Sequence, residues 1–160
     1  MIRGIHHVAV HVHDMARMIR FYKEAFGFEV VGEPFAWEND DFVDRIVSVK
    51  GSASKGAMLR AGSCYIEMFQ YSAPKPNNTE GLDPFDKGYT HFCVDVVGIE
   101  EEIPRLRSVG MTFPEDGAID VGHVKTLYGR DPEGNLIEIQ ETIDAQCDFP
   151  LDRLPPIAKK

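Results

Sequence analysis

One order of strand and helix signals occurs twice in this chain. From Ile5 to Val12, residues alternate as in a strand with two distinct faces, and apolar residues then recur at helical spacing from Met15 to Phe26. The same order follows from Thr90 to Val96 and from Ile99 to Leu106. Each half therefore predicts a strand, a helix and three further strands.

Turn and cap residues support the repeat. Asp14 stands where a side chain can accept hydrogen bonds from the first turn of a helix, and Gly27 and Gly110 stand where helices end. The segment 131–135 places Pro and Gly as a tight turn requires. Pro104 fits less well, because proline inside a helix should kink or shorten it.

These signals also predict the boundaries of the halves. We expect a single domain over 1–145, made of modules at about 4–71 and 88–142, with a proline-rich loop at 72–87 and a C-terminal tail at 146–160. The remaining strands are expected at 28–31, 46–50, 57–60 and 64–71 in the first half, and at 124–128 and 136–140 in the second.

Composition excludes some classes of function. The chain has 160 residues and a formal net charge of −9, which disfavours nonspecific binding to nucleic acid or to an anionic membrane. No apolar run approaches the roughly 20 residues of a membrane helix, and the first residues leave no room for a signal peptide. Three cysteines without a CxxC pair favour reduced thiols. We therefore expect a cytoplasmic protein.

Each half provides one histidine from its first strand and one glutamate from its last. If those two strands are neighbours, His7 and Glu67 project from one face of a sheet, and so do His91 and Glu138. A single histidine on a strand is usually structural, but here chance would have to place the same pair twice. The four residues therefore predict a site for one divalent ion: Zn, Ni, Co, Mn or ferrous iron.

Other polar and aromatic residues lie near the predicted site in sequence. Tyr65 and Phe69 share the face of Glu67. Tyr128 and Arg130 share one face of the strand before the last, whereas His123 takes the other, so a regular strand cannot direct all three inward. We consider these five as substrate-binding residues. His6 is expected on the opposite face from His7, and Phe35, Trp37 and Phe42 are expected in a loop at 34–44, as a lid or a cluster.

The chain resembles the vicinal oxygen chelate superfamily, which includes glyoxalase I, methylmalonyl-CoA epimerase and the extradiol dioxygenases. The resemblance covers Ile5 to Glu141, and 131–138 is its most specific part. It implies an α+β fold in which paired βαβββ modules form a cup-shaped mixed β-sheet. It also implies that His7, Glu67, His91 and Glu138 occupy the metal-ligand positions. The matching segments are 7–10 with Asp14, 20–22, 26–28, 66–69, 91–96 and 131–138.

Two histidines and two glutamates resemble the ligand set of bacterial glyoxalase I and the epimerases. The resemblance implies a lyase or isomerase that transfers a proton next to a carbonyl through a metal-bound enediolate, with Glu138 or Glu67 as the base. It also implies a small oxygenated substrate and a homodimer. A glutathione site is in doubt, because no Arg and Asn positions mark one.

Three alternatives remain. A ferrous extradiol-type dioxygenase would use His7, His91 and Glu138, with Glu67 as a surplus ligand that crowds the oxygen site. A methylmalonyl-CoA epimerase-like enzyme would need a basic site for CoA. A metal-free protein that binds an antibiotic would line its site with aromatic residues such as Tyr65, Phe69 and Tyr71, although this chain keeps all four candidate ligands.

Overall fold

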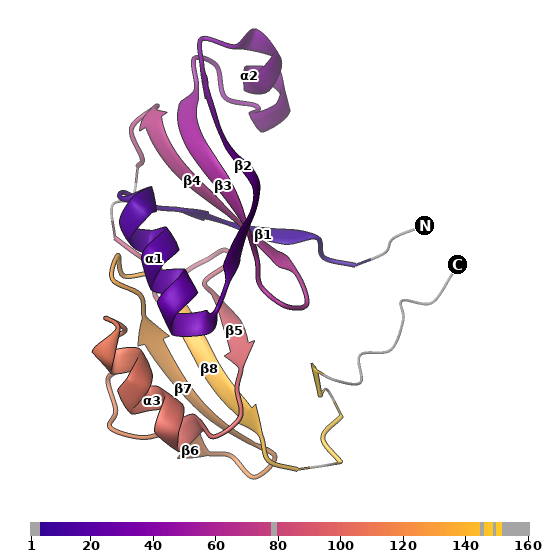
Figure 1. Ribbon diagram of the computed structural model, residues 1–160, viewed down its shortest axis with the longest axis vertical. Helices are drawn as coiled ribbons and strands as arrows, with labels where there is room; N and C mark the ends of the chain where they lie inside the picture. The colour runs from indigo at the N-terminus through magenta and orange to yellow at the C-terminus, as the bar shows by residue number, and fades with distance from the viewer. Residues whose placement is uncertain (1–3, 78–79, 145, 149, 152–160) are drawn as a thin grey trace. The chain divides into compact units, whose positions relative to one another are not determined.

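The computed structural model describes residues 4–77, 80–144, 146–148 and 150–151. The chain divides into two compact units, Ile5–Thr79 and Glu80–Lys160 with Met1–Gly4, and each unit is described by itself. Each has a four-stranded sheet with a helix against one face (Figure 1). The predicted tail at 146–160 lies largely outside the described residues.

In the first unit the strand order is β1-β4-β3-β2. Strand β1 runs parallel to β4, and the β2–β3 and β3–β4 pairs are antiparallel. The elements in chain order are β1 (His7–His11), α1 (Met15–Phe26), β2 (Glu29–Glu38), α2 (Asp41–Val47), β3 (Ala53–Arg60) and β4 (Tyr65–Ala73).

The second unit repeats this arrangement. Its strand order is β5-β8-β7-β6, with β5 parallel to β8 and the other neighbours antiparallel. Its elements are β5 (His91–Asp95), α3 (Ile99–Ser108), β6 (Ile119–Asp120), β7 (Val124–Arg130) and β8 (Leu136–Thr142). The predicted α+β fold of paired βαβββ modules is confirmed.

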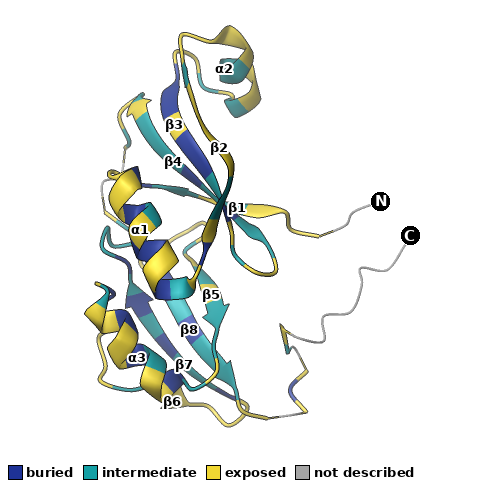
Figure 2. Ribbon diagram, in the orientation of Figure 1, coloured by how far each residue is buried: buried dark blue, intermediate teal, exposed yellow. Residues whose placement is uncertain are grey.

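The core of each unit lies between the helix and one face of the sheet. Helix α1 buries an apolar stripe at helical spacing, and α3 does the same (Figure 2). The buried residues of α1 are Met15, Met18, Phe21, Tyr22 and Ala25; those of the sheet include Ala57, Leu59, Ile66 and Met68. Because side chains alternate along a strand, this packing directs the neighbouring residues, including Glu67, to the face away from the helix.

The caps of α1 are those predicted from the sequence. The Asp14 carboxylate accepts a hydrogen bond from the Arg17 amide at 3.0 Å, and Gly27 ends the helix with a φ of 68°. Helix α3 begins differently. Gly98 has no side chain to cap it, and the Glu141 carboxylate of β8 accepts from the amides of Gly98 and Ile99 at 2.6 and 3.1 Å.

Two predictions about local structure were wrong. The strand expected at 46–50 is absent, and the α2 helix occupies Asp41–Val47, because Asp40 caps it by accepting from the amides of Phe42 and Val43. The loop expected at 34–44 is a strand as far as Glu38. Helix α3 spans Ile99–Ser108 with Pro104 inside it, as the stripe of Ile99, Ile103 and Leu106 predicts. The two-residue strand β6 was not predicted, since so short a segment has no recognisable alternation.

The turn at 131–135 connects β7 to β8 as predicted. The Asp131 carboxylate is almost fully buried and accepts from the amides of Glu133 and Asn135, both at 2.9 Å. Gly134 adopts a φ of 88°, which a residue with a side chain rarely takes. The turn thereby fixes where β8, which contains Glu138, begins.

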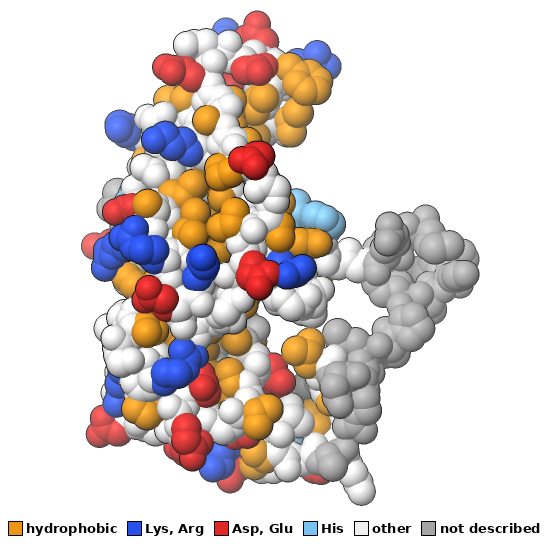
Figure 3. Space-filling view, viewed as in Figure 1, with side chains coloured by type: hydrophobic (Ala, Val, Ile, Leu, Met, Phe, Trp, Pro, Cys, Tyr) orange, Lys and Arg blue, Asp and Glu red, His pale blue; other side chains and the backbone are white. Residues whose placement is uncertain are grey.

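Charges of both signs are interspersed on the face shown in Figure 3. Exposed hydrophobic side chains occur at α2, where Phe42 and Ile46 are 68% and 66% exposed. Within the described part of the chain, no helix is long and apolar enough to cross a membrane.

Candidate metal centre

The first unit brings His7 and Glu67 together. Strands β1 and β4 are parallel neighbours, with Ala9 opposite Glu67 and His7 opposite Tyr65. His7 and Glu67 therefore lie diagonally on one face of the sheet, and His7 Nε2 is 3.1 Å from Glu67 Oε2. Both side chains keep some exposure to solvent, 39% for the histidine and 21% for the glutamate.

The second unit brings His91 and Glu138 together in the same way. Strands β5 and β8 are parallel neighbours with Cys93 opposite Glu138, which is the offset found between Ala9 and Glu67. His91 Nε2 is 3.3 Å from Glu138 Oε2. The expected pairing of first and last strands, and the shared face, are thus observed in both units.

The donor atoms of each pair suit a divalent ion. Two donors about 2.1 Å from one ion, at ligand angles of about 90° to 110°, lie about 3.0 to 3.4 Å apart. Separations of 3.1 and 3.3 Å fall in this range. One imidazole nitrogen and one carboxylate oxygen are also ligands that Zn, Ni, Co, Mn and ferrous iron accept. Each pair therefore fits as half of a ligand set.

The second ring nitrogen of each histidine has a neighbour of its own. His7 Nδ1 is 3.0 Å from His6 Nδ1, and His91 Nδ1 is 3.0 Å from Thr90 Oγ1. Such partners orient a ligating imidazole and fix which nitrogen faces the metal. Here they leave Nε2 toward the glutamate in both units. His6 was expected on the opposite face, but it precedes β1, so its ring turns toward His7.

Hydroxyl groups surround the pair of the second unit. The Thr126 hydroxyl donates to Glu138 Oε1 at 2.6 Å, and the Tyr128 hydroxyl lies 3.2 Å from His91 Nε2. Burial and the Glu138 charge raise the pKa of Tyr128. Burial, followed by the charges of Glu138 and Asp95, raises the pKa of Cys93 to about 12. The phenol and the thiol are therefore neutral near pH 7 and can donate hydrogen bonds.

Of the other predicted residues, some lie near a His–Glu pair and others do not. Tyr128 reaches its pair, and Tyr65 stacks on His6 with ring centroids 5.1 Å apart. Arg130 instead donates to the carbonyls of Leu82 and Gly134 and pairs with Asp83, so it ties the start of its unit to the β7–β8 turn.

His123 and Phe69 complete the predicted set. His123 is exposed just before β7, and its carbonyl accepts from the amides of Ile143 and Asp144. Phe69 lies two residues beyond Glu67 on the same strand face, as expected.

The four candidate ligands thus occur as two pairs, one in each unit. Among residues 4–77, 80–144, 146–148 and 150–151, no group of three or more His, Cys, Asp and Glu side chains could hold a metal ion. Thr90 and Thr126 were missed by the sequence analysis. Thr126 is two residues before Tyr128 on the same strand face, and only the β7–β8 register shows that its hydroxyl reaches Glu138.

Residues 4–139 match the glyoxalase/bleomycin resistance protein/dioxygenase superfamily, which is most of the chain. The chain belongs to this superfamily. The resemblance inferred from the sequence is therefore confirmed, and the duplicated βαβββ unit is the fold of glyoxalase-family structures.

Individual members of the glyoxalase superfamily are distant from this chain. Lactoylglutathione lyase of Schizosaccharomyces pombe is 22% identical over 142 residues, which are 84% of this chain but only 46% of the lyase. A glyoxalase family protein of Bacillus cereus has a similar structure, with a TM-score of 0.77, 20% identity and coverage of 90% of this chain and 96% of that protein.

A second solved structure was determined with a metal. The fosfomycin resistance protein FosX of Listeria monocytogenes, complexed with Mn(II) and sulfate, has a TM-score of 0.57 and 17% identity. The match covers 88% of this chain and 93% of FosX. At this identity the likeness shows the fold alone.

Proposed function

We propose that this chain is a divalent-metal-dependent lyase or isomerase of the glyoxalase I-like type, which transfers a proton next to a carbonyl of a small oxygenated substrate. The observation that carries the proposal is the His–Glu pair at the same position of both sheets. The similarity to lactoylglutathione lyase and the Mn(II) in FosX support it.

His7, Glu67, His91 and Glu138 would bind one ion together, within one chain or between two chains. The donor set is compatible with Zn, Ni, Co, Mn or ferrous iron. When bound, the ion supplies positive charge that stabilises negative charge developing on two neighbouring oxygens of the substrate. Four protein ligands leave one or two positions for those oxygens if the ion is five- or six-coordinate.

The proton is moved by a carboxylate of this chain. Glu67 or Glu138 takes it from the carbon next to the carbonyl and returns it to the neighbouring carbon. The Thr126 hydroxyl holds one oxygen of Glu138 at 2.6 Å and so orients this carboxylate. The neutral Tyr128 phenol, beside His91, donates a hydrogen bond to the substrate.

Hydrogen exchange at the substrate tests the reaction. The protein, loaded in turn with nickel, cobalt, zinc, manganese or ferrous iron, is incubated in deuterated water with an α-keto hemithioacetal, a racemic acyl-CoA and a catechol. Exchange of a substrate proton for deuterium without oxygen uptake is the expected result. Oxygen uptake with ferrous iron and catechol would instead indicate a dioxygenase, and tight binding without turnover would indicate sequestration.

We also propose that the protein is a cytoplasmic homodimer. The three cysteines, all within the described residues, are free, as in a reducing compartment. The dimer is inferred from the superfamily. Sedimentation equilibrium of the metal-loaded protein checks it, with twice the mass of 18.0 kDa expected.

A further inference from the structure

Four aromatic rings lie beside the His7–Glu67 pair on the same face of the first sheet. Phe35 and Trp37 come from β2, and Phe69 and Tyr71 come from β4; we call these four residues the aromatic wall. Phe35 stacks on Trp37 at 6.3 Å, and Trp37 contacts the edges of Phe69 and Tyr71 at 5.9 and 5.7 Å. Figure 2 shows α1 against the opposite face, where the core lies.

The absence of a side chain at position 56 makes room for the wall. Gly56 lies opposite both Phe35 and Phe69. A Cβ at this position would be 2.2 Å from the Phe35 ring, so the ring occupies the space that a side chain at position 56 would fill. Phe35 is still 38% exposed, which leaves part of the wall open to a ligand.

Trp37 is fixed in place by a partly buried chain of hydrogen bonds. Its Nε1 donates to the Ser52 hydroxyl at 2.7 Å, and that hydroxyl donates to Asp44 Oδ1 at 2.6 Å. Ser52 is fully buried, and the Asp44 carboxylate also accepts from the amides of Gly51 and Ser52. The indole is thus preorganised, and a bound ring would lose little energy in ordering it.

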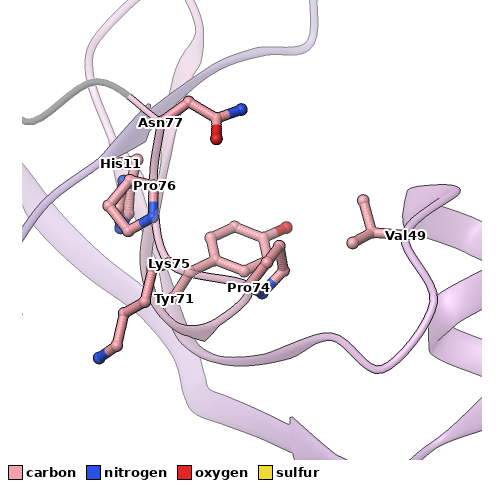
Figure 4. A pocket seen from close by; sticks show the side chains of 7 residues that line it. All are labelled: His11, Val49, Tyr71, Pro74, Lys75, Pro76 and Asn77. Atoms are coloured by element: carbon pink, nitrogen blue, oxygen red, sulfur yellow. The ribbon is translucent and has the colours of Figure 1, made fainter.

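A cavity continues the wall beyond Tyr71. Its volume is about 300 Å³, and Tyr71, His11, Val49 and Pro74 are among its lining residues (Figure 4). This volume lies at the lower end of the range for small-molecule sites. The phenol oxygen of Tyr71 points toward the side of the cavity where Val49 lies. Burial and the Glu67 charge raise the pKa of Tyr71, so the phenol is neutral near pH 7.

We propose that the aromatic wall binds a planar, uncharged ring of the substrate, joined by a short linker to the two neighbouring oxygens that react. The linker length follows from strand geometry, since two residues along β4 separate Phe69 from Glu67 by about 7 Å. The proposal rests on the proposed function for the position of the reacting oxygens. The ring site itself requires no metal.

Trp37 is the only tryptophan of the chain, so its fluorescence reports directly on the wall. The full-length protein, with and without added metal, is titrated with 1-hydroxy-4-phenylbutan-2-one and with hydroxyacetone, which has the same two oxygens but no ring or linker. Calorimetry measures each dissociation constant. We expect a saturable change in Trp37 fluorescence with the aromatic probe alone, and at least tenfold tighter binding of that probe with or without metal.

Two phenylalanine variants localise the effect. Phe35→Ala removes a ring of the wall and should weaken binding of 1-hydroxy-4-phenylbutan-2-one about fivefold, as loss of one aromatic contact predicts. Phe42→Ala makes the same change at an exposed ring of α2 outside the wall and should leave binding within twofold. The circular dichroism spectrum of each variant checks that it is folded.

Three results would overturn the proposal. These are equal affinity for the two probes, equal loss in both variants, or a change of oligomeric state in Phe35→Ala without a change in probe affinity, which would assign the wall to a second copy of the chain. A failure of the proposed metal site would be recognised separately, because ring binding is measured in the metal-free protein and does not depend on metal uptake. His7→Ala should accordingly abolish metal uptake but keep binding of the ring in the metal-free protein.

Discussion

The two His–Glu pairs have the same backbone setting and different neighbours. Opposite Glu67 stands Met58, and two residues earlier on that strand stands Gly56. Opposite Glu138 stands Tyr128, and the residue two positions earlier is Thr126. The first unit therefore surrounds its pair with apolar and aromatic groups, whereas the second surrounds it with hydroxyls. The parallel pairing of the first and last strands brings each histidine to its glutamate. The strand on the other side of the glutamate, β3 or β7, determines which side chains surround the pair.

This difference gives the two units different roles in the proposed function. A carboxylate held by a hydroxyl at 2.6 Å keeps its orientation, so Glu138 has a fixed direction. In the first unit the position equivalent to Thr126 is Gly56, and the Phe35 ring lies against it. The first unit is thus suited to contact the apolar body of a substrate, and the second to orient polar groups.

The largest expected effect comes from removing either carboxylate. If both pairs bind the same ion, Glu67→Ala and Glu138→Ala should each lower kcat/KM at least about 1000-fold, because each removes a ligand and a candidate base. Steady-state rates at saturating metal measure this. A Glu67→Ala variant that keeps full activity would make Glu67 a surplus ligand and favour the dioxygenase arrangement.

A smaller effect is expected from the hydroxyl beside Glu138. Thr126→Val keeps the shape of the side chain but removes the donor, and loss of such an orienting partner typically costs 10- to 100-fold in activity or metal affinity. Thr112→Val, at an exposed position that pairs with Arg130 through its backbone, is the matched control and should have no effect. Equal effects of the two changes would remove the contrast between the units.

The stability of the fold should depend on the absence of a side chain at Gly56, beside the aromatic wall. Gly56→Ala places a Cβ against the Phe35 ring and should lower the free energy of unfolding by about 1 to 3 kcal/mol, measured by urea denaturation. Gly117→Ala is the control, because a Cβ there meets its nearest atom at 3.6 Å, an ordinary contact. Tolerance of Gly56→Ala would show that Phe35 is not held against β3.

The smallest effect concerns the helix starts, which also differ between the units. The neutral Gln70 side chain accepts from the Met15 amide at 3.2 Å in the first unit, whereas in the second the charged Glu141 accepts from two amides. These hydrogen bonds lower the pKa of Glu141 below 4.5. A lowered pKa means that the carboxylate stabilises the fold above pH 4.5 and that this contribution disappears as the pH falls.

Glu141→Gln should therefore cost about 1 kcal/mol at pH 7, the usual value of a helix cap. The difference from the wild type should narrow as the pH falls below about 4.5. Urea midpoints between pH 3 and pH 7 measure it. A difference that stays constant with pH would mean that the charge of Glu141 contributes nothing.

The sequence predicted the repeated architecture because each long element has its own period. Helix α1 has a clear apolar stripe between its caps, Asp14 and Gly27, and its bounds are those predicted. The α2 helix was missed because seven residues contain too few turns to show a helical stripe. Its capping residue, Asp40, was the signal available.

Only the part of the candidate site that is repeated in both halves of the sequence could be predicted. His7 with Glu67 and His91 with Glu138 could be paired because duplication fixed their equivalent places. The groups that distinguish the pairs could not. Thr126 reaches Glu138, and Ser52 holds Trp37, through the register of adjacent strands and a loop contact, which no local pattern encodes.

The proposed function requires both His–Glu pairs to bind a single ion, so the number of ions bound per chain decides between a shared ion and two separate ones. Elemental analysis of the metal-loaded protein after removal of free metal should give one ion per chain, and His7→Ala and His91→Ala should each reduce this to none. Exposed His13→Ala should keep one ion. Two ions per chain, with each site variant keeping one, would show that the pairs bind metal separately and that they share no ion.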